Sequence, residues 1–228
     1  ANNQVLVTGG FERLQDNTAE TKPATATNTT TNINLSWFPK TNLPNMTIGY
    51  LFASNENDMS TDSLWRINDR SHRFLVQFGK SFTFWGQHTA SLSVSTSTRD
   101  DQTRRNLDAK NTTVSLSNST SFSFPLQTLV SLMISSNKFS VDSAITAQSI
   151  TTNYTSLYAT ARYKFLENKL SIEASISPTF GDIERMLFDV RSEYSLLQNL
   201  SLLGQVSIYM NKHATNDVIW SFILRVGI

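Results

Sequence analysis

The 228-residue sequence contains no cysteine, few charged residues and no long apolar run. Without cysteine the chain has neither a disulfide framework nor thiol chemistry. The charged fraction of 16% lies well below the roughly 25% that is usual for soluble globular domains. A membrane-spanning α-helix needs roughly 18 or more consecutive apolar residues, and the sequence has no such run. These absences argue against a disulfide-stapled domain, an ordinary soluble domain and a helical membrane protein.

The sequence also lacks a dominant sign of charge. Its formal net charge is +1, and basic residues alternate with acidic ones in the segment 99–110. That segment interleaves Arg99, Arg104, Arg105 and Lys110 with Asp100, Asp101 and Asp108. Surfaces that bind nucleic acid present a basic patch or stripe, so no nucleic-acid partner is expected.

What the chain does contain is a regular alternation of apolar and polar residues, clearest in residues 218–228. Every even position there is apolar, whereas the odd positions include Ser221, Arg225 and Gly227. A complete apolar stripe opposite a mixed polar stripe is typical of a strand with lipid on one side and a wet interior on the other. The pattern recurs along most of the sequence, and the aromatic fraction of 11% argues against disorder.

The alternating segments predict about twelve strands, each near the length that crosses a bilayer at a tilt. We assign them to residues 3–15, 30–39, 46–56, 70–83, 88–99, 110–123, 128–141, 151–165, 169–181, 185–197, 200–213 and 217–228. An even number fits a closed antiparallel up-and-down transmembrane β-barrel with both termini on one side. The sequence therefore predicts an all-β barrel that forms a single domain, residues 1–228. The chain enters its first strand at once, as a processed mature N-terminus or a trimmed chain would.

The connections between these segments alternate in length. The short ones are 41–45, 85–87, 125–127, 167–168 and 198–199. The connections that alternate with them are the long segments 16–29, 57–69, 100–109 and 142–150 and the shorter segments 182–184 and 214–216. Outer-membrane barrels have short periplasmic turns and longer extracellular loops. We therefore expect a bacterial outer-membrane location, with both termini in the periplasm and the loops 16–29, 57–69 and 100–109 outside.

Aromatic residues gather where the predicted strands meet the short turns. They are Trp37, Phe82, Phe84, Trp85, Phe122, Phe124, Tyr163, Phe165 and Tyr194. A soluble sandwich would concentrate its aromatics at mid-strand, between its sheets. Clustering near one end of consecutive strands instead predicts an interfacial girdle at the depth of the lipid headgroups.

Strict alternation along a strand separates a lipid-facing set from an inward set. The apolar set includes Leu92, Leu116, Ile172, Val190 and Val206. Two polar residues, Asn118 and Thr120, fall on this apolar stripe, which indicates a bulge or a neighbouring protein at that place. The inward set of the fifth and sixth strands is a wall of small hydroxyls, Ser91, Ser93, Ser95, Ser97, Ser115, Ser117, Ser119, Ser121 and Ser123.

Charges of both signs occupy the inward positions of the later strands. They are Arg162, Lys164, Glu173, Asp189, Arg191, Glu193 and Arg225, with Glu12 of the first strand beside them after closure. Confined charges are costly unless paired, so interior salt bridges are expected. The charges either line a channel for ions or solutes or fill and rigidify a narrow barrel. A strand count of about twelve lies between filled barrels of about eight strands and open ones of about sixteen.

No motif for catalysis, a cofactor or a metal ion is present. The histidines are His72, His88 and His213, and none falls on the mid-membrane apolar stripe in this assignment. His72 and His213 have Asp69 and Asp217 nearby in sequence, which leaves a rim hydrolase as a minor alternative. We expect neither a metal nor a cofactor, and no enzymatic activity.

The chain resembles bacterial outer-membrane β-barrel proteins as a class, through residues 220–228, the aromatic turns and the alternation of loop lengths. The terminal stripe is similar to the assembly signal read by the barrel-insertion machinery, although it ends in Ile rather than Phe or Trp. The residues that carry this likeness are Trp220, Phe222, Leu224, Val226 and Ile228. Twelve-stranded members of the class include small-solute channels, a phospholipase and autotransporter translocation barrels, so the fold alone does not assign the function.

Three functions therefore remain as hypotheses. The first is a narrow porin-like channel for small polar or charged solutes, lined by the charged wall. The second is a non-conducting barrel that anchors or scaffolds a larger envelope complex through its loops or its lipid face. The third is the rim hydrolase. The expected partners are outer-membrane lipid, the barrel-assembly machinery during insertion and, for the second hypothesis, envelope proteins.

Overall fold

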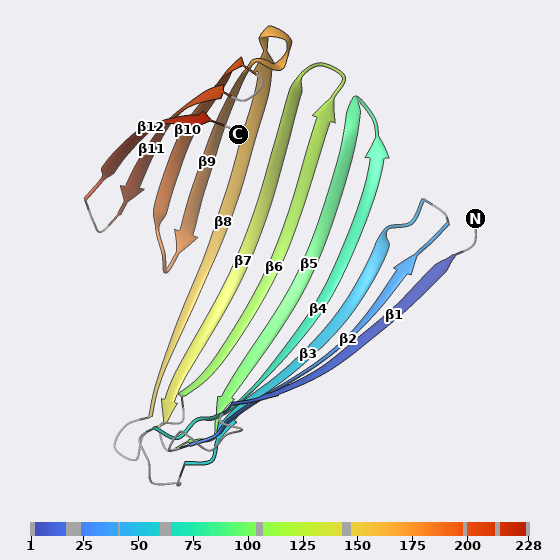
Figure 1. Ribbon diagram of the computed structural model, residues 1–228, viewed down its shortest axis with the longest axis vertical. Helices are drawn as coiled ribbons and strands as arrows, with labels where there is room; N and C mark the ends of the chain where they lie inside the picture. Colours follow the sequence, from blue (N-terminus) through green and yellow to red (C-terminus); the bar gives the residue numbers. More distant parts are fainter. Residues whose placement is uncertain are drawn as a thin grey trace. The chain divides into compact units, whose positions relative to one another are not determined.

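The computed structural model describes residues 3–16, 24–40, 42–59, 65–103, 107–142, 147–197, 200–212 and 215–226. Twelve strands form one sheet in chain order (Figure 1). They are β1 (Gln4–Gln15), β2 (Ala26–Phe38), β3 (Asn45–Asn57), β4 (Asn68–Thr83), β5 (Gly86–Asp101), β6 (Leu107–Phe122), β7 (Leu126–Asp142), β8 (Ala147–Phe165), β9 (Leu170–Gly181), β10 (Arg185–Leu197), β11 (Leu200–Asn211) and β12 (Asp217–Val226). The predicted all-β class and twelve up-and-down strands are confirmed. In the described part of the chain, no helix is long and apolar enough to cross a membrane.

Several strands extend further into the predicted loops than the sequence indicated. Strand β2 begins at Ala26 rather than at residue 30, and β8 begins at Ala147 rather than at residue 151. The assignment of residues 26–29 to a loop was therefore wrong. Ala26 pairs with Asn57, and Thr29 pairs with Ser54 on β3. β-branched threonine favours extended backbone, and pairing with β3 supplies the hydrogen bonds that the local sequence does not reveal.

The structure divides into two units. The first consists of residues 1–79, 93–114 and 135–152, and the second of residues 80–92, 115–134 and 153–228. In the first unit, the antiparallel register of β1 to β4 places Val7, Leu35, Ile48 and Val76 in one row. The next row, on the opposite face, holds Thr8, Asn34 and Gly49 on β1 to β3 and Leu75 on β4. The predicted separation into an apolar and a polar face therefore holds in this row for β1 to β3, and Leu75 departs from it.

The second unit shows the same separation over β8 to β12. One row of facing residues is apolar and consists of Ala161, Ala174, Val190, Val206 and Trp220. The adjacent row, one residue along each strand, is polar and consists of Arg162, Glu173, Arg191, Gln205 and Ser221. Residues directly opposite each other in an antiparallel pair share a face of the sheet. At this level five consecutive strands therefore present one apolar row and one polar row. Two residues along, Leu203 and Ile223 lie on the polar face in the row of Glu193.

Burial in this protein is inverted relative to a soluble domain. Among the described residues, Leu203 is the buried hydrophobic side chain, whereas the buried polar side chains are His88, Asp101, Thr120, Ser135, Thr179 and Ser207. Apolar side chains at mid-strand are instead exposed, as at Leu116 (52%), Val190 (48%) and Val206 (43%). In soluble proteins such aliphatic residues are among those most often buried. The apolar face of the sheet therefore requires an apolar environment outside the chain.

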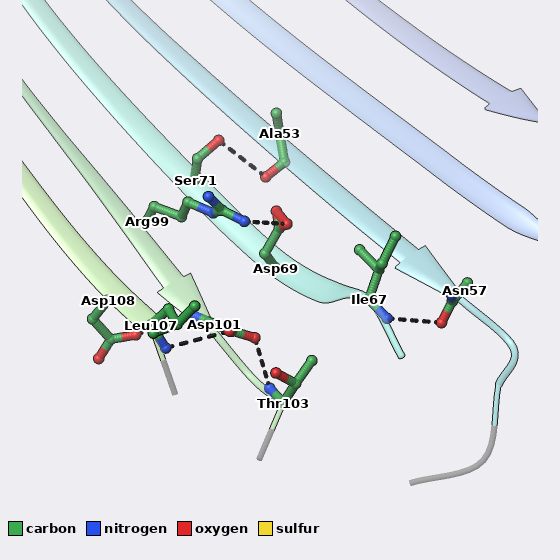
Figure 2. Close-up of polar contacts among 10 residues, drawn as sticks. All are labelled: Ala53, Asn57, Ile67, Asp69, Ser71, Arg99, Asp101, Thr103, Leu107 and Asp108. Atoms are coloured by element: carbon green, nitrogen blue, oxygen red, sulfur yellow. Dashed lines mark hydrogen bonds and ion pairs between the residues drawn. The ribbon is translucent and has the colours of Figure 1, made fainter. Parts of the chain in front are cut away.

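Asp and Asn side chains close the strand ends at several loops. The Ile67 amide donates to Asn57 Oδ1 at 2.8 Å, and the Asn57 amide donates to the Ile67 carbonyl at 2.9 Å. Across the next loop, Asp101 accepts hydrogen bonds from the amides of Thr103 and Leu107 (Figure 2). Short polar side chains of this kind readily accept from nearby backbone amides. These contacts hold the ends of the loops that join β3 to β4 and β5 to β6.

Two tight connections depend on left-handed backbone. Leu166, Glu167 and Asn168, which form the short element η1 between β8 and β9, have φ values of 51°, 55° and 71°. Gly181 at the end of β9 has a φ of 110°, and a Cβ there would lie 2.5 Å from the Asn153 carbonyl oxygen. Glycine alone combines that backbone with so close an approach.

Candidate functional site

The predicted charged residues of β8, β9 and β10 lie on one face of the second unit. Arg162 on β8 faces Glu173 on β9, and Glu173 faces Arg191 on β10. One row further along, Lys164 and Glu193 both face Ser171. Side chains from three strands therefore converge on a single patch, which we call the charged wall, together with Asp189 on β10 and Arg225 on β12.

Glu193 lies at the centre of the charged wall. Its carboxylate is 4.0 Å from Arg162 Nη2 and 3.9 Å from Arg225 Nη1. Strand β9 lies between Glu193 and Arg162, and β11 lies between Glu193 and Arg225. The carboxylate on β10 therefore reaches over one strand on each side, to β8 and to β12. Arg162 also donates to the Ser171 hydroxyl at 3.3 Å. These two ion pairs confirm part of the expected salt-bridge network. Their length leaves the charges close without direct hydrogen bonds.

Asp189 is satisfied by neutral partners rather than by a cation. Gln205 Nε2 donates to Asp189 Oδ2 at 2.7 Å, and the buried Ser207 hydroxyl donates to the same oxygen at 2.5 Å. Asp189 faces Ser207 directly in the register of β10 and β11. Hydrogen bonds to a carboxylate are shorter and stronger than neutral ones. The expected ion pair is here replaced by an amide and a hydroxyl.

The remaining members of the wall have no ion pair within 4 Å in the described part of the chain. They are Lys164, Glu173 and Arg191. Glu173 and Arg191 line a 90 Å³ cavity with Arg162, Ser171 and Glu193. A second cavity of 160 Å³ lies nearer the turn that joins β6 to β7, between Arg162, Lys164 and Gln127. These charges border small polar spaces, and the prediction that every inward charge is paired holds only for part of the wall.

Glu12 lies in the first unit. It faces Thr30 on the polar side of β1 and is exposed.

The predicted wall of hydroxyls on β5 and β6 is formed in part. In the second unit, the hydroxyl oxygens of Ser91 and Ser117 lie 2.7 Å apart and share a hydrogen bond.

The predicted aromatic girdle lies at the turn ends of the strands. Trp37 shares a row with Val5, Met46 and Phe78. Around the other turns, Phe82, Phe84, Trp85, Phe124, Phe165 and Tyr194 are all exposed. Several of these aromatics pack on each other, and the ring centroids are 4.6 Å apart for Phe84 and Trp85, 5.1 Å for Phe122 and Phe124, and 4.5 Å for Tyr163 and Phe165.

The terminal stripe forms strand β12. Its predicted residues Trp220, Phe222, Leu224 and Val226 are between 61% and 72% exposed, and Ile228 lies outside the described residues. Phe222 faces Gly204 on β11, where an added Cβ would lie 3.3 Å from the Phe222 ring. Glycine at 204 therefore gives the aromatic ring room to cover the strand beside it.

The residues considered for a rim hydrolase do not meet. Asp69 pairs with Arg99 at 3.0 Å (Figure 2), whereas His72 Nδ1 lies 2.8 Å from the Tyr50 hydroxyl. Asp69 and His72 have opposite parity on β4 and therefore point to opposite faces. His213 lies outside the described residues. Over the described ranges, no group of three or more acidic or histidine side chains is arranged to hold a metal ion.

One polar cluster was only partly anticipated by the sequence. His88 lies on the same stripe of β5 as Ala90 and Leu92, at the turn end of the strand and not at its middle. His88 is 5% exposed, and its Nδ1 lies 2.9 Å from the Thr120 hydroxyl. Asn118 donates to that hydroxyl at 3.1 Å. The sequence signal was the pair Asn118 and Thr120 on an apolar stripe, but their partner on β5 depends on strand pairing.

No protein-family model matches the chain, and no curated protein matches it in sequence. Solved structures that align with it include the KdgM porin in complex with disordered oligogalacturonate, at 9% identity and a TM-score of 0.34, over 98% of this chain and 99% of that chain. Another is the β domain of the Bordetella autotransporter BrkA, at 10% identity and a TM-score of 0.38, over the full length of both chains.

Proposed function

We propose that this protein is an outer-membrane β-barrel that acts as a narrow passive channel for small polar or charged solutes. The observation that carries the proposal is the inverted burial. Apolar side chains such as Val190 and Val206 are exposed on one face, whereas hydroxyls such as Ser207 are buried on the other. Backbone groups exposed to a bilayer core must be hydrogen-bonded within the chain, and for strands a closed barrel achieves this. An even-stranded meander then has both termini on the periplasmic side.

The charged wall is the proposed lining of the channel. Its charges have both signs and belong to neighbouring strands, so their side chains project into the same stretch of the lumen. Arg162 is 40% and Glu193 26% exposed at the side chain, and small polar cavities lie between the charges. A wall with charges of both signs favours small polar or charged solutes. Such a solute loses part of its hydration in a narrow lumen, and the charged side chains of the wall replace some of the lost contacts with water.

A non-conducting barrel that anchors a larger envelope complex is the second candidate. The observation in its favour is the connection of the wall across strands. Glu193 links β8 to β12, and Asp189 is held by both Gln205 and Ser207. Such a network also serves to fill and rigidify a narrow interior.

Conductance separates the two candidates. The purified protein is inserted into a planar bilayer across a salt gradient, and the double variant Arg191→Ala with Arg225→Ala is compared with wild type. A channel gives discrete current steps, and the variant moves the reversal potential toward cation selectivity while the barrel stays folded. A silent wild-type barrel, with insertion confirmed by protease protection, contradicts the channel and favours the anchor.

A further inference from the structure

A cavity of 470 Å³ lies beside His88 on the face that carries the apolar stripes of β5, β6 and β7. Its walls are apolar side chains, among them Ala90, Leu116, Val130 and Leu132. At the turn end it is bordered by Phe82, Phe84 and Trp85. The cavity therefore begins at the aromatic girdle and runs toward the middle of the strands.

Two buried polar atoms at this cavity have no hydrogen-bond partner among the residues that the structure describes. They are His88 Nε2 and Asn118 Oδ1, and both residues line the cavity. The His88 ring stacks on Phe82, with the centroids 4.8 Å apart, and meets the edge of Trp85 at 5.5 Å. A buried polar group without a partner is costly, so the packing that fixes this ring points to a ligand that completes the missing hydrogen bonds.

The hydrogen-bond chain assigns a different role to each atom. Asn118 Nδ2 donates to Thr120 Oγ1, which leaves Asn118 Oδ1 as an acceptor. The Thr120 hydroxyl lies 2.9 Å from His88 Nδ1. Because the hydroxyl oxygen already accepts from Asn118, we assign the hydroxyl proton to this bond, which places the ring proton on Nε2. The cavity therefore offers one donor and one acceptor next to an apolar space.

A second cavity extends the apolar space. It has a volume of 460 Å³ and shares Val130 with the first. Ala159, Ala161 and Ala174 form part of its floor, and Phe188 lies among its walls. Small alanine side chains beside a large aromatic ring leave a depression along the face, which suits a flexible hydrocarbon chain.

We propose that this face binds one phospholipid whose headgroup carries an N–H or O–H donor, as phosphatidylethanolamine does. An ester or phosphate oxygen of the lipid accepts from His88 Nε2, and the headgroup donor bonds Asn118 Oδ1. An acyl chain fills the apolar space between Ala90 and Leu132. The depth agrees with this, because the tryptophan and phenylalanine rings of a girdle lie at the level of the headgroups. The inference rests on the proposed membrane location of the apolar face.

The test is native mass spectrometry of the detergent-purified protein with two lipids that have the same acyl chains. Palmitoyl-oleoyl phosphatidylethanolamine has the headgroup donor, and palmitoyl-oleoyl phosphatidylcholine lacks it. Wild type is expected to retain one phosphatidylethanolamine and to bind phosphatidylcholine about tenfold more weakly, the effect of one lost hydrogen bond in a buried site. Asn118→Leu should remove that preference, because it removes the acceptor for the headgroup donor. His88→Phe should weaken the binding of both lipids and leave their ratio unchanged, because both lipids have the oxygen that accepts from His88.

Ser192→Ala is the matched control, because Ser192 is a polar residue on the apolar face of β10 outside both cavities. It should leave the lipid preference unchanged. His88→Gln keeps an N–H donor and should retain more of the binding of both lipids than His88→Phe does. Equal binding of both lipids to wild type, or an unchanged preference in Asn118→Leu, overturns the proposal. A wild-type protein that purifies as a dimer without bound lipid also overturns the proposal. That result would indicate that a second copy of the chain covers the apolar face beside His88.

Failure of the lipid site is distinguishable from failure of the membrane proposal. Protease protection after reconstitution into vesicles of palmitoyl-oleoyl phosphatidylcholine reports insertion independently of the proposed bound lipid. A protein that inserts and shows no lipid preference contradicts only the site. A protein that does not insert contradicts the membrane location itself.

Discussion

The carboxylate of Glu193 on β10 lies 3.9 Å from the guanidinium of Arg225 on β12, although β11 runs between the two strands. The same carboxylate is 4.0 Å from Arg162 on β8. The negative charge of Glu193 therefore partly offsets the positive electrostatic potential of both Arg162 and Arg225. Whether the charged wall controls ion passage is most sharply probed at this residue.

Replacing Glu193 with Gln removes one negative charge from between the two arginines and keeps the shape of the side chain. The reversal potential across a salt gradient should move toward anion selectivity. The loss of stability should be less than about 1 kcal/mol, because the ion pairs are long and partly exposed. Glu184→Gln is the control, since it makes the same charge change at a strand-end pair with Lys212. Equal selectivity of the two variants would remove Glu193 from the channel lining.

The two faces of β11 should respond oppositely to a new lysine. Val206 lies on the apolar face, and Gln205 lies on the polar face beside Asp189. Val206→Lys should destabilise the inserted barrel by about 2–4 kcal/mol, the cost of a cation on the lipid side near mid-membrane. Gln205→Lys should cost about 1 kcal/mol or less, because the cation lies beside a carboxylate in a wet interior. Urea unfolding in vesicles, followed by tryptophan fluorescence, measures both. Similar losses for the two variants would contradict the assignment of the faces.

The terminal strand should need its aromatic stripe. Phe222 is 72% exposed and covers Gly204, so Phe222→Ser removes a large apolar surface from contact with lipid. We expect a loss of about 2 kcal/mol, the value of burying a phenylalanine side chain, and a lower yield of inserted barrel in cells. Ser221→Ala, one residue away on the other face, should change neither. Normal insertion of Phe222→Ser would reject the stripe as an assembly signal.

The orientation is accessible to single-cysteine labelling, because the natural chain has no cysteine. A cysteine at Thr103, in the loop between β5 and β6, should react with a membrane-impermeant maleimide added to intact cells. A cysteine at Ser123, in the short turn between β6 and β7, should react only after the outer membrane is opened. The opposite pattern of labelling would invert the proposed topology.

The sequence predicted the twelve strands and the face of each residue because both follow from a local period of two. Val190 and Arg191 are assigned to opposite faces from their neighbours alone. The start of β2 was missed, because residues 26–29 become a strand only through pairing with Asn57 and the residues before it. Pairing energy between segments distant in the chain is absent from any local pattern.

The candidate site was also predicted only in part from the sequence. Alternation and closure placed the charges on one wall, but the central position of Glu193 depends on registers among β8 to β12. Alternation also flagged Asn118 and Thr120 as polar residues on an apolar stripe. The contact of Thr120 with His88, and the cavity that His88 and Asn118 line, required the alignment of β5 with β6. The sequence therefore predicted which residues belong to the site and which face they occupy. It did not predict which of them are in contact across neighbouring strands.

The most direct test of the central claim is fluorescence quenching of a probe attached to a cysteine at position 190 or 191 in the reconstituted protein. These adjacent positions differ only in the face to which they point. A probe at 190 should be quenched by nitroxide-labelled lipid and resist aqueous iodide, and a probe at 191 should be quenched by iodide and resist the lipid. Equal quenching by iodide at both positions would contradict a membrane-facing apolar stripe and with it the proposed barrel.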